Sequence, residues 1–103
     1  MDTKILDLFE REYGRVDRNG SEYYIYDNCG SMKGRLTDCG CETYVYDSNG
    51  SSAGRLNDCG SEIYVYDSNG SSLGRFNMSG YDVYAYDSNG SSIEAGYLLR
   101  RLL

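Results

Sequence analysis

The sequence predicts an all-β protein, an antiparallel meander of about eight or nine strands, rolled or closed into a barrel and capped by a short N-terminal helix. Two observations support this fold class. Every tenth residue from position 20 to position 90 is glycine, and glycine commonly ends a strand at a tight turn. Between the glycines, apolar and polar residues alternate as in a strand with one buried face. A solenoid of stacked β-hairpins is the structural alternative.

The 103 residues are too few for two ordinary domains, so we expect one domain made of tandem repeats. Its expected parts are a helical cap at 1–14, four 20-residue hairpin repeats at 15–34, 35–54, 55–74 and 75–96, and a C-terminal cap at 97–103. Several copies are needed because a single hairpin cannot bury its apolar face alone.

The two ends of the chain depart from the repeat. A helix is expected over residues 4–13, with Asp2 or Thr3 as its N-cap and Gly14 at its end. Its apolar residues fall on one side: Ile5, Leu6, Phe9 and Tyr13. The last segment, IEAGYLLRRLL, is apolar enough for either a final strand or a short helix, and both remain open.

Two-residue turns are expected at each Xaa-Gly pair. Asn-Gly, the commonest of these pairs, is the strongest signal for a type I′ turn, in which both central residues have positive φ. A turn at Asn69-Gly70 places Ile63, Tyr64, Val65 and Tyr66 opposite Phe76, Arg75, Gly74 and Leu73. A turn at Cys59-Gly60 places Leu56, Arg55 and Gly54 opposite Ile63, Tyr64 and Val65. Both registers produce the same two faces.

One face of the expected sheet is aliphatic and the other carries tyrosine and arginine. The aliphatic face comprises Val16, Ile25, Leu36, Leu56, Ile63, Val65, Phe76, Val83 and Ala85, with Gly34, Gly54 and Gly74 between them. The opposite face comprises Tyr24, Tyr26, Tyr44, Tyr46, Tyr64, Tyr66, Tyr84 and Tyr86 with Arg15, Arg35, Arg55 and Arg75. An aliphatic face of this size must leave water, and glycines within strands let the sheet coil around it.

Charge and composition exclude several classes of function. A net charge of −6 without a basic run argues against a nucleic-acid partner. No segment approaches the length of a membrane span, and the N-terminus has no secretory signal pattern, so a cytoplasmic location is expected, with secretion or the cell surface as the alternative. Because there is no histidine and the carboxylates and serines recur in every repeat, we expect neither an enzyme nor a bound cofactor.

Two further patterns are interpreted as structural. The loop sequence Asp-Ser-Asn-Gly-Ser-Ser has one carboxylate, too few for a calcium site, so Asp47, Asp67 and Asp87 are expected to accept hydrogen bonds from backbone N–H groups of their turns. The four cysteines are expected to be free thiols and not metal ligands: Cys29, Cys39, Cys41 and Cys59.

Three families of hairpin repeat are similar to parts of the chain. The segments Tyr44 to Gly50, Tyr64 to Gly70 and Tyr84 to Gly90 follow Tyr-Xaa-Tyr-Asp-Xaa-Xaa-Gly and resemble the YD repeat of bacterial RHS and teneurin-like shells. The segment Gly20 to Asp27 with Gly30-Ser31-Met32 resembles the cell-wall-binding repeats of choline-binding and glucan-binding proteins, which implies ligand binding between aromatic residues of adjacent hairpins. The Gly-Arg-hydrophobic steps resemble short uncharacterised bacterial repeat proteins, which implies no activity.

The tyrosine and arginine face is the candidate functional surface. Aromatic ladders bind sugars, cations and extended peptides, whereas cross-strand Tyr–Arg pairs also stabilise a sheet without any ligand. The candidate ligand-binding residues are Tyr24, Tyr44, Tyr64, Tyr84, Arg35, Arg55 and Arg75. We expect a non-enzymatic repeat scaffold or protein-interaction module, and the alternative is a module that binds a glycan or the cell wall.

Overall fold

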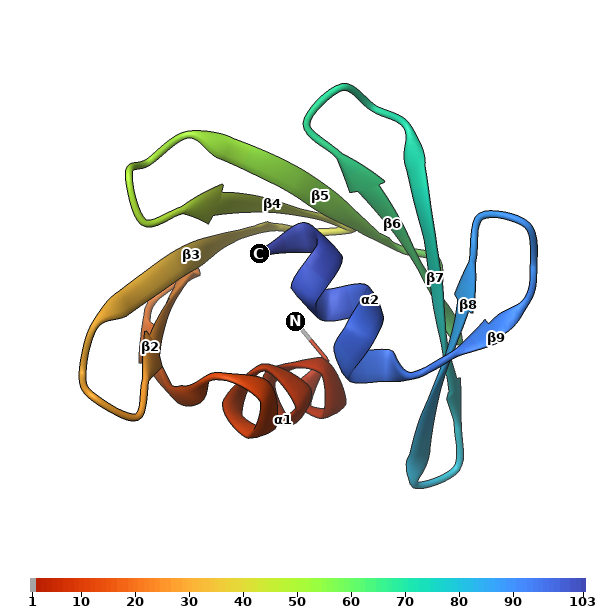
Figure 1. The fold of residues 1–103 in the computed structure, drawn as a ribbon, viewed down its shortest axis with the longest axis horizontal. Coiled ribbons are helices and arrows are strands. Elements are labelled where there is room, and N and C mark those ends of the chain that lie inside the picture. The colour runs from red at the N-terminus through yellow and green to blue at the C-terminus, as the bar shows by residue number, and fades with distance from the viewer. Residues whose placement is uncertain (1) are drawn as a thin grey trace.

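The computed structural model describes residues 2–103, which form one nine-stranded antiparallel sheet and two helices (Figure 1). The strands follow one another in the sheet in chain order, as expected for a meander. The elements are α1 (Thr3–Glu12), β1 (Gly14–Asn19), β2 (Glu22–Asp27), β3 (Met32–Cys39), β4 (Glu42–Asp47), β5 (Ser52–Asp58), β6 (Glu62–Asp67), β7 (Ser72–Ser79), β8 (Asp82–Asp87), β9 (Ser92–Ile93) and α2 (Ala95–Leu102).

The sheet curls into an open trough and does not close into a barrel, so the expectation of a closed barrel is wrong. Strands β1 and β9 are the two edges of the sheet and do not pair with each other. Closure fails because the chain leaves the sheet after Ile93 and continues as α2, which lies in the hollow of the trough (Figure 1). Helix α2 packs on β6, β7, β8 and α1, while α1 lies against β1.

Helix α1 has the expected N-cap, and the open question about the C-terminal segment is resolved in favour of a helix. The Asp2 carboxylate accepts a hydrogen bond from the Lys4 backbone N–H at 2.8 Å, which satisfies one of the free donors at the helix start. Neither helix is long and apolar enough to cross a membrane, as far as residues 2–103 are concerned.

The turns at Asn49-Gly50, Asn69-Gly70 and Asn89-Gly90 have three loop residues, so the two-residue type I′ turn is wrong there. In the hairpin of β6 and β7, the Gly70 N–H donates to the Asp67 carbonyl at 3.0 Å, and the Asp67 N–H donates to the Ser71 carbonyl at 2.9 Å. Gly70 has φ of +85°, and within residues 2–103 only glycines have positive φ, so Asn69 cannot occupy a type I′ position. The geometry is a type I turn followed by glycine in a G1 bulge.

A second irregularity restores the expected register of this hairpin. Strand β7 is bulged, so that Tyr66 lies opposite Ser72 instead of Leu73. Beyond the bulge the predicted pairs are confirmed: Ile63 with Phe76, Tyr64 with Arg75 and Val65 with Gly74. The longer loop shifts the pairing by one residue and the bulge shifts it back.

The turns at the other end of the strands begin with glycine, which corrects the register predicted at Cys59-Gly60. The loop is Gly60-Ser61, closed by the Cys59 N–H donating to the Glu62 carbonyl at 2.9 Å, and Gly60 has φ of +88°. A two-residue loop with glycine first is typical of type II′. Leu56 therefore lies opposite Val65, Arg55 opposite Tyr66 and Gly54 opposite Asp67.

This correction moves the register by two residues, which leaves every side chain on its predicted face. It also explains why cysteine can precede these glycines. Cys39 and Cys59 sit at or beside the end of a strand, where no positive φ is required.

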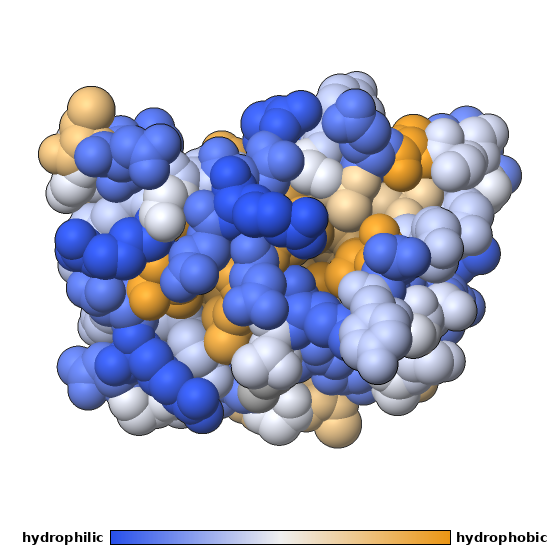
Figure 2. Space-filling view, turned by 90° about the horizontal axis from the view of Figure 1, so that it is seen from below, coloured by the Kyte–Doolittle hydropathy of each residue, from blue (hydrophilic) through white to orange (hydrophobic). Residues whose placement is uncertain are grey.

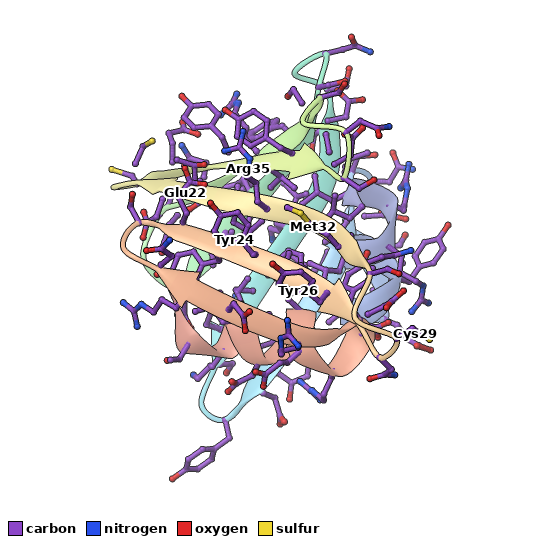
Figure 3. The ribbon with its side chains drawn as sticks, turned by 90° about the vertical axis from the view of Figure 1, so that its left-hand side faces the viewer. Glu22, Tyr24, Tyr26, Cys29, Met32 and Arg35 are labelled. Carbon is purple, nitrogen blue, oxygen red and sulfur yellow. The ribbon has the colours of Figure 1, made fainter. Side chains whose placement is uncertain are left out.

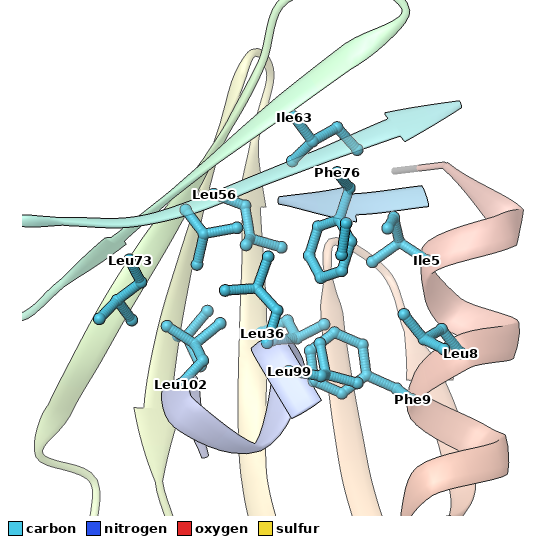
Figure 4. Packing of buried hydrophobic residues seen from close by; sticks show 14 of the residues in the cluster. Ile5, Leu8, Phe9, Leu36, Leu56, Ile63, Leu73, Phe76, Leu99 and Leu102 are labelled. Atoms are coloured by element: carbon cyan, nitrogen blue, oxygen red, sulfur yellow. The ribbon is translucent and has the colours of Figure 1, made fainter. Parts of the chain in front are cut away.

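The aliphatic face of the sheet and one side of each helix form the core (Figure 4). Of the predicted aliphatic face, seven residues are buried: Ile25, Leu36, Leu56, Ile63, Val65, Phe76 and Ala85. Val16 on β1 and Val83 on β8 are only partly buried because they lie near the edges of the sheet. The helices contribute Ile5, Leu8, Phe9, Leu98, Leu99 and Leu102. The trough is thus filled by the two helices in place of a closing strand.

Candidate binding surface

The convex face of the trough carries the predicted tyrosine and arginine residues, and we call it the Tyr/Arg face. Each inner strand that begins at Glu22, Glu42 or Glu62 presents Glu and two Tyr outward, and the next strand presents Arg beside them. Figure 3 shows the first such group, with Glu22, Tyr24 and Tyr26 along β2 and Arg35 on β3. The same arrangement of side chains recurs along the face because the sequence repeats every 20 residues.

The structure brings six of the seven predicted site residues together in pairs. These cross-strand pairs are Tyr24 with Arg35, Tyr44 with Arg55 and Tyr64 with Arg75. Tyr84 is the exception, because β8 pairs with β9 only at Ala85 and Tyr86. On its other side Tyr84 lies opposite Asn77. The tyrosines remain accessible, with 40% of Tyr44, 37% of Tyr64 and 48% of Tyr84 exposed.

Each inner arginine also has two partners that the sequence analysis did not identify. Arg55 forms an ion pair with Glu42 at 3.1 Å, and its guanidinium lies 4.2 Å from the ring centroid of Tyr66. The same unit occurs twice more, as Glu22–Arg35–Tyr46 and Glu62–Arg75–Tyr86. Arg15 makes the same contact with Tyr26 at 4.4 Å but forms its ion pair with Asp17 on its own strand.

The ring contact follows directly from the turn that begins with glycine. That turn places Arg55 opposite Tyr66, whereas the predicted register placed it opposite Tyr64. Each inner arginine is therefore flanked by a tyrosine on both neighbouring strands. The recurrence of glutamate two residues before the first tyrosine of each repeat was the signal in the sequence that could have revealed the ion pairs.

Glu42 on this face is held in its charged form by its hydrogen-bond partners. Asn57 donates a hydrogen bond to Glu42 at 2.8 Å, and Arg55 adds two more at 3.1 and 3.2 Å. The Asn57 hydrogen bond, with the smaller effect of Arg55, outweighs the opposing effect of burial and holds the pKa of the Glu42 carboxyl below its usual range. The arginine is thus fixed by a carboxylate that remains ionised in mildly acidic solution.

Two shallow grooves lie on the Tyr/Arg face and are related by the repeat. One, of about 340 Å³, is lined by Tyr44, Ser52, Gly54, Arg55, Asp67 and Ser68 together with Asn69 and Gly70. The other, of about 110 Å³, is lined by Tyr64, Ser72, Gly74, Arg75, Asp87 and Ser88. The six shared positions are offset by one repeat. In the preceding repeat Met32, labelled in Figure 3, stands where these grooves have Ser52 and Ser72.

The aspartates of the Asn-Gly turns have the predicted role. The Asp67 carboxylate accepts hydrogen bonds from the backbone N–H groups of Asn69 and Ser71, both at 2.9 Å. Asp27, Asp47 and Asp87 do the same in their loops. Each carboxylate is therefore engaged in stabilising its own turn.

No metal-binding cluster of three or more His, Cys, Asp or Glu residues exists within residues 2–103. All four cysteines are exposed and none forms a disulfide: Cys29, Cys39, Cys41 and Cys59. The Cys59 thiol lies 2.6 Å from the side-chain oxygen of Asn57.

No family model matches the chain, and no curated protein and no solved structure is a match. The likeness to YD repeats and to cell-wall-binding repeats therefore stays a prediction based on short motifs.

Proposed function

We propose that the protein is a non-enzymatic repeat scaffold that acts as a protein-interaction module through its Tyr/Arg face. The observation that supports this most is the row of three Glu–Arg–Tyr units in register. Tyrosine and arginine are among the residue types enriched where proteins bind one another. Here they are already ordered by their neighbours, so binding would cost little side-chain entropy.

The same row supports a role other than catalysis. The ion pair and the ring contact of each inner arginine recur in three successive repeats. An active site needs one asymmetric group of residues, whereas a scaffold benefits from repetition because every copy adds to the same surface.

The scaffold proposal predicts that the tyrosine ladder stabilises the fold. Replacing Tyr44, Tyr64 and Tyr84 together by Thr should lower the free energy of unfolding by roughly 1 to 3 kcal/mol, since each cross-strand pair is worth about 0.2 to 1 kcal/mol. The measurement is urea denaturation followed by circular dichroism. Tyr81, which is fully exposed in its loop, is the matched control, and Tyr81→Thr should leave stability unchanged. Equal stability of the triple variant and the control would contradict the structural role of the ladder.

A glycan-binding module is the second candidate, and the two repeat-related grooves favour it. Each groove combines an aromatic ring with arginine, aspartate and serine side chains, a combination suited to the apolar faces and hydroxyl groups of sugars. A polysaccharide could place successive units in successive grooves.

The two candidates differ in their response to ligands. A ligand that binds only the folded protein raises its melting temperature, and the rise increases with ligand concentration. The scaffold proposal expects no dose-dependent rise with peptidoglycan fragments, teichoic acid, choline or simple oligosaccharides. A rise with one of them that disappears in the folded Tyr44, Tyr64 and Tyr84 variant would replace the scaffold proposal by the glycan-binding one.

A further inference from the structure

The fourth hairpin lacks a backbone contact that the first three share. In these three, the carbonyl of the second loop residue accepts a hydrogen bond from the next hairpin, at 2.8 Å in each case. The three bonds run from Asp38 N–H to Ser21, from Asp58 N–H to Cys41 and from Met78 N–H to Ser61. With the same 20-residue spacing, the fourth bond would run from the Leu98 N–H to the Tyr81 carbonyl.

Leu98 instead donates its N–H to the Glu94 carbonyl within α2, at 3.2 Å. Strand β9 pairs with β8 only at Ala85 and Tyr86. In the earlier hairpins the residues equivalent to Val83 have a partner strand, as in the pair of Ile63 with Phe76. The outer edge of β8 from Tyr81 to Tyr84 therefore has no strand beside it.

The orientation of the free groups follows from the alternation of an antiparallel ladder. Asp82 and Ser79 flank the two-residue loop of the β7–β8 hairpin, so their backbone groups face each other across it. The backbone groups of the next residue, Val83, then point away from β7. This edge thus offers one N–H and one carbonyl from Val83 and one carbonyl from Tyr81.

A groove of about 300 Å³ runs beside this edge, between β8, α1 and the start of α2. Its apolar lining includes Leu8 and Val83, and its charged lining includes Arg11, Asp82 and Glu94. Figure 2, viewed from below, shows apolar surface at the floor of recesses bordered by hydrophilic residues. The volume lies at the lower end of the range of about 300 to 1,000 Å³ that is typical of binding pockets.

The charges at the groove favour a basic occupant. Asp82 and Glu94 are both exposed, whereas Glu12 is neutralised by an ion pair with Arg100. Arg11 is the cation of the groove lining, and the Lys4 ammonium group donates a hydrogen bond to the Gly80 carbonyl at the end of the edge. A second copy of this chain would bring a second Asp82 and Glu94 to the paired edge, and like charges on paired edges are destabilising.

We propose that the free edge of β8 binds an extended basic peptide of a partner protein as an added strand. The peptide backbone pairs with Val83 and with the Tyr81 carbonyl. The peptide residue opposite Val83 is apolar and points into the groove beside Leu8. Its two neighbours point outward, as Asp82 does, and are lysine or arginine. This site lies apart from the Tyr/Arg face and does not depend on the function proposed for it.

The test uses three fluorescein-labelled pentapeptides and the full chain. The probe alternates arginine and valine (Arg-Val-Arg-Val-Arg), the charge control replaces arginine by glutamate, and the backbone control carries N-methyl groups on both valine amides. Fluorescence anisotropy should show saturable binding of the probe and at least tenfold weaker binding of each control. Equal affinity of the probe and the N-methylated peptide would overturn strand addition, because only general charge attraction would then remain.

Two further measurements locate the site. Asp82→Lys should weaken binding of the probe at least tenfold, while Asp17→Lys on the opposite edge strand should not. Amide hydrogen exchange should show that the probe slows exchange at Val83. Absence of both effects, absence of binding up to about 1 mM probe, or a stable dimer of the protein alone in sedimentation velocity would each refute the proposal.

Discussion

Gly54→Ala is expected to be among the most damaging single-methyl additions in the protein. A Cβ atom at Gly54 would lie 2.2 Å from the Tyr66 carbonyl oxygen and 2.7 Å from Cδ1 of Leu102. The leucine can rotate, but the carbonyl belongs to the backbone of β6 and cannot move without disturbing the ladder. Gly54 also has φ of +148°, a backbone conformation that residues with a Cβ rarely adopt.

The expected cost combines these two effects. Backbone strain contributes about 1 to 3 kcal/mol and forced overpacking about 1 to 3 kcal/mol, which together make about 2 to 6 kcal/mol. A domain of this size is stable by about 5 to 15 kcal/mol, so the variant should lose a large part of its free energy of unfolding. Urea denaturation should show the midpoint lowered by about 1 to 3 M with an unchanged slope.

Gly70→Ala is the matched control. Gly70 also has positive φ, at +85°, but a Cβ atom there would have no neighbour within 4 Å. Its cost should be only the backbone penalty of about 1 to 2 kcal/mol. If Gly54→Ala proves no more destabilising than Gly70→Ala, close approach of β6 is not the reason for glycine at this position.

Two further predictions concern side chains with perturbed ionisation. The Tyr13 hydroxyl is buried without a hydrogen-bond partner, so Tyr13→Phe should raise the free energy of unfolding by about 1 kcal/mol. Burial, followed by the charge of Glu12, raises the pKa of Tyr13. The wild-type protein should therefore lose stability as the pH rises above 10, and it should lose more than Tyr13→Phe. Parallel pH profiles of the melting temperature for the two proteins would count against this. The pKa of Glu42 is lower in the folded protein than its usual value. The ionised Glu42 carboxylate therefore stabilises the fold at pH values above the usual pKa, and this stabilisation is lost as the pH falls through the lowered pKa. Asn57→Ala lacks the hydrogen bond that is the largest cause of the lowered Glu42 pKa. Between pH 7 and pH 3 the melting temperature should therefore fall more for the wild-type protein than for Asn57→Ala. An equal fall would refute the role given to Asn57.

The faces of the sheet could be predicted from the sequence because side-chain direction depends only on parity along a strand. The prediction survived an error of two residues at Gly60 for the same reason. The turn types could not be predicted, since Asn-Gly fits a type I′ turn on composition alone and cysteine before glycine does not say where the loop begins. The position of the residue with positive φ decides between the turn types, and the structure shows that within residues 2–103 this residue is glycine at every turn.

The contacts of the candidate surface were predictable only in part. The pairing of Tyr64 with Arg75 follows from the hairpin that was predicted correctly. The stacking of Arg55 on Tyr66 depends on the turn at Gly60, where the predicted register was wrong. The ion pairs join diagonal residues of the correctly predicted hairpin, such as Glu62 and Arg75, and they were missed because the prediction considered only residues directly opposite each other.

The open edge of β8 follows from the way the C-terminal segment buries its leucines. Leu98, Leu99 and Leu102 lie on one side of α2, and all three are buried. If β9 continued along β8, Leu98 and Leu99 would point to opposite faces, so one of them would face water at a cost of about 1.5 to 3 kcal/mol. The ladder hydrogen bonds gained at Val83 would contribute only about 0.5 to 1.5 kcal/mol each, because water already satisfies an exposed edge. The helix is therefore the better way to fill the trough, and the unpaired edge is its direct consequence.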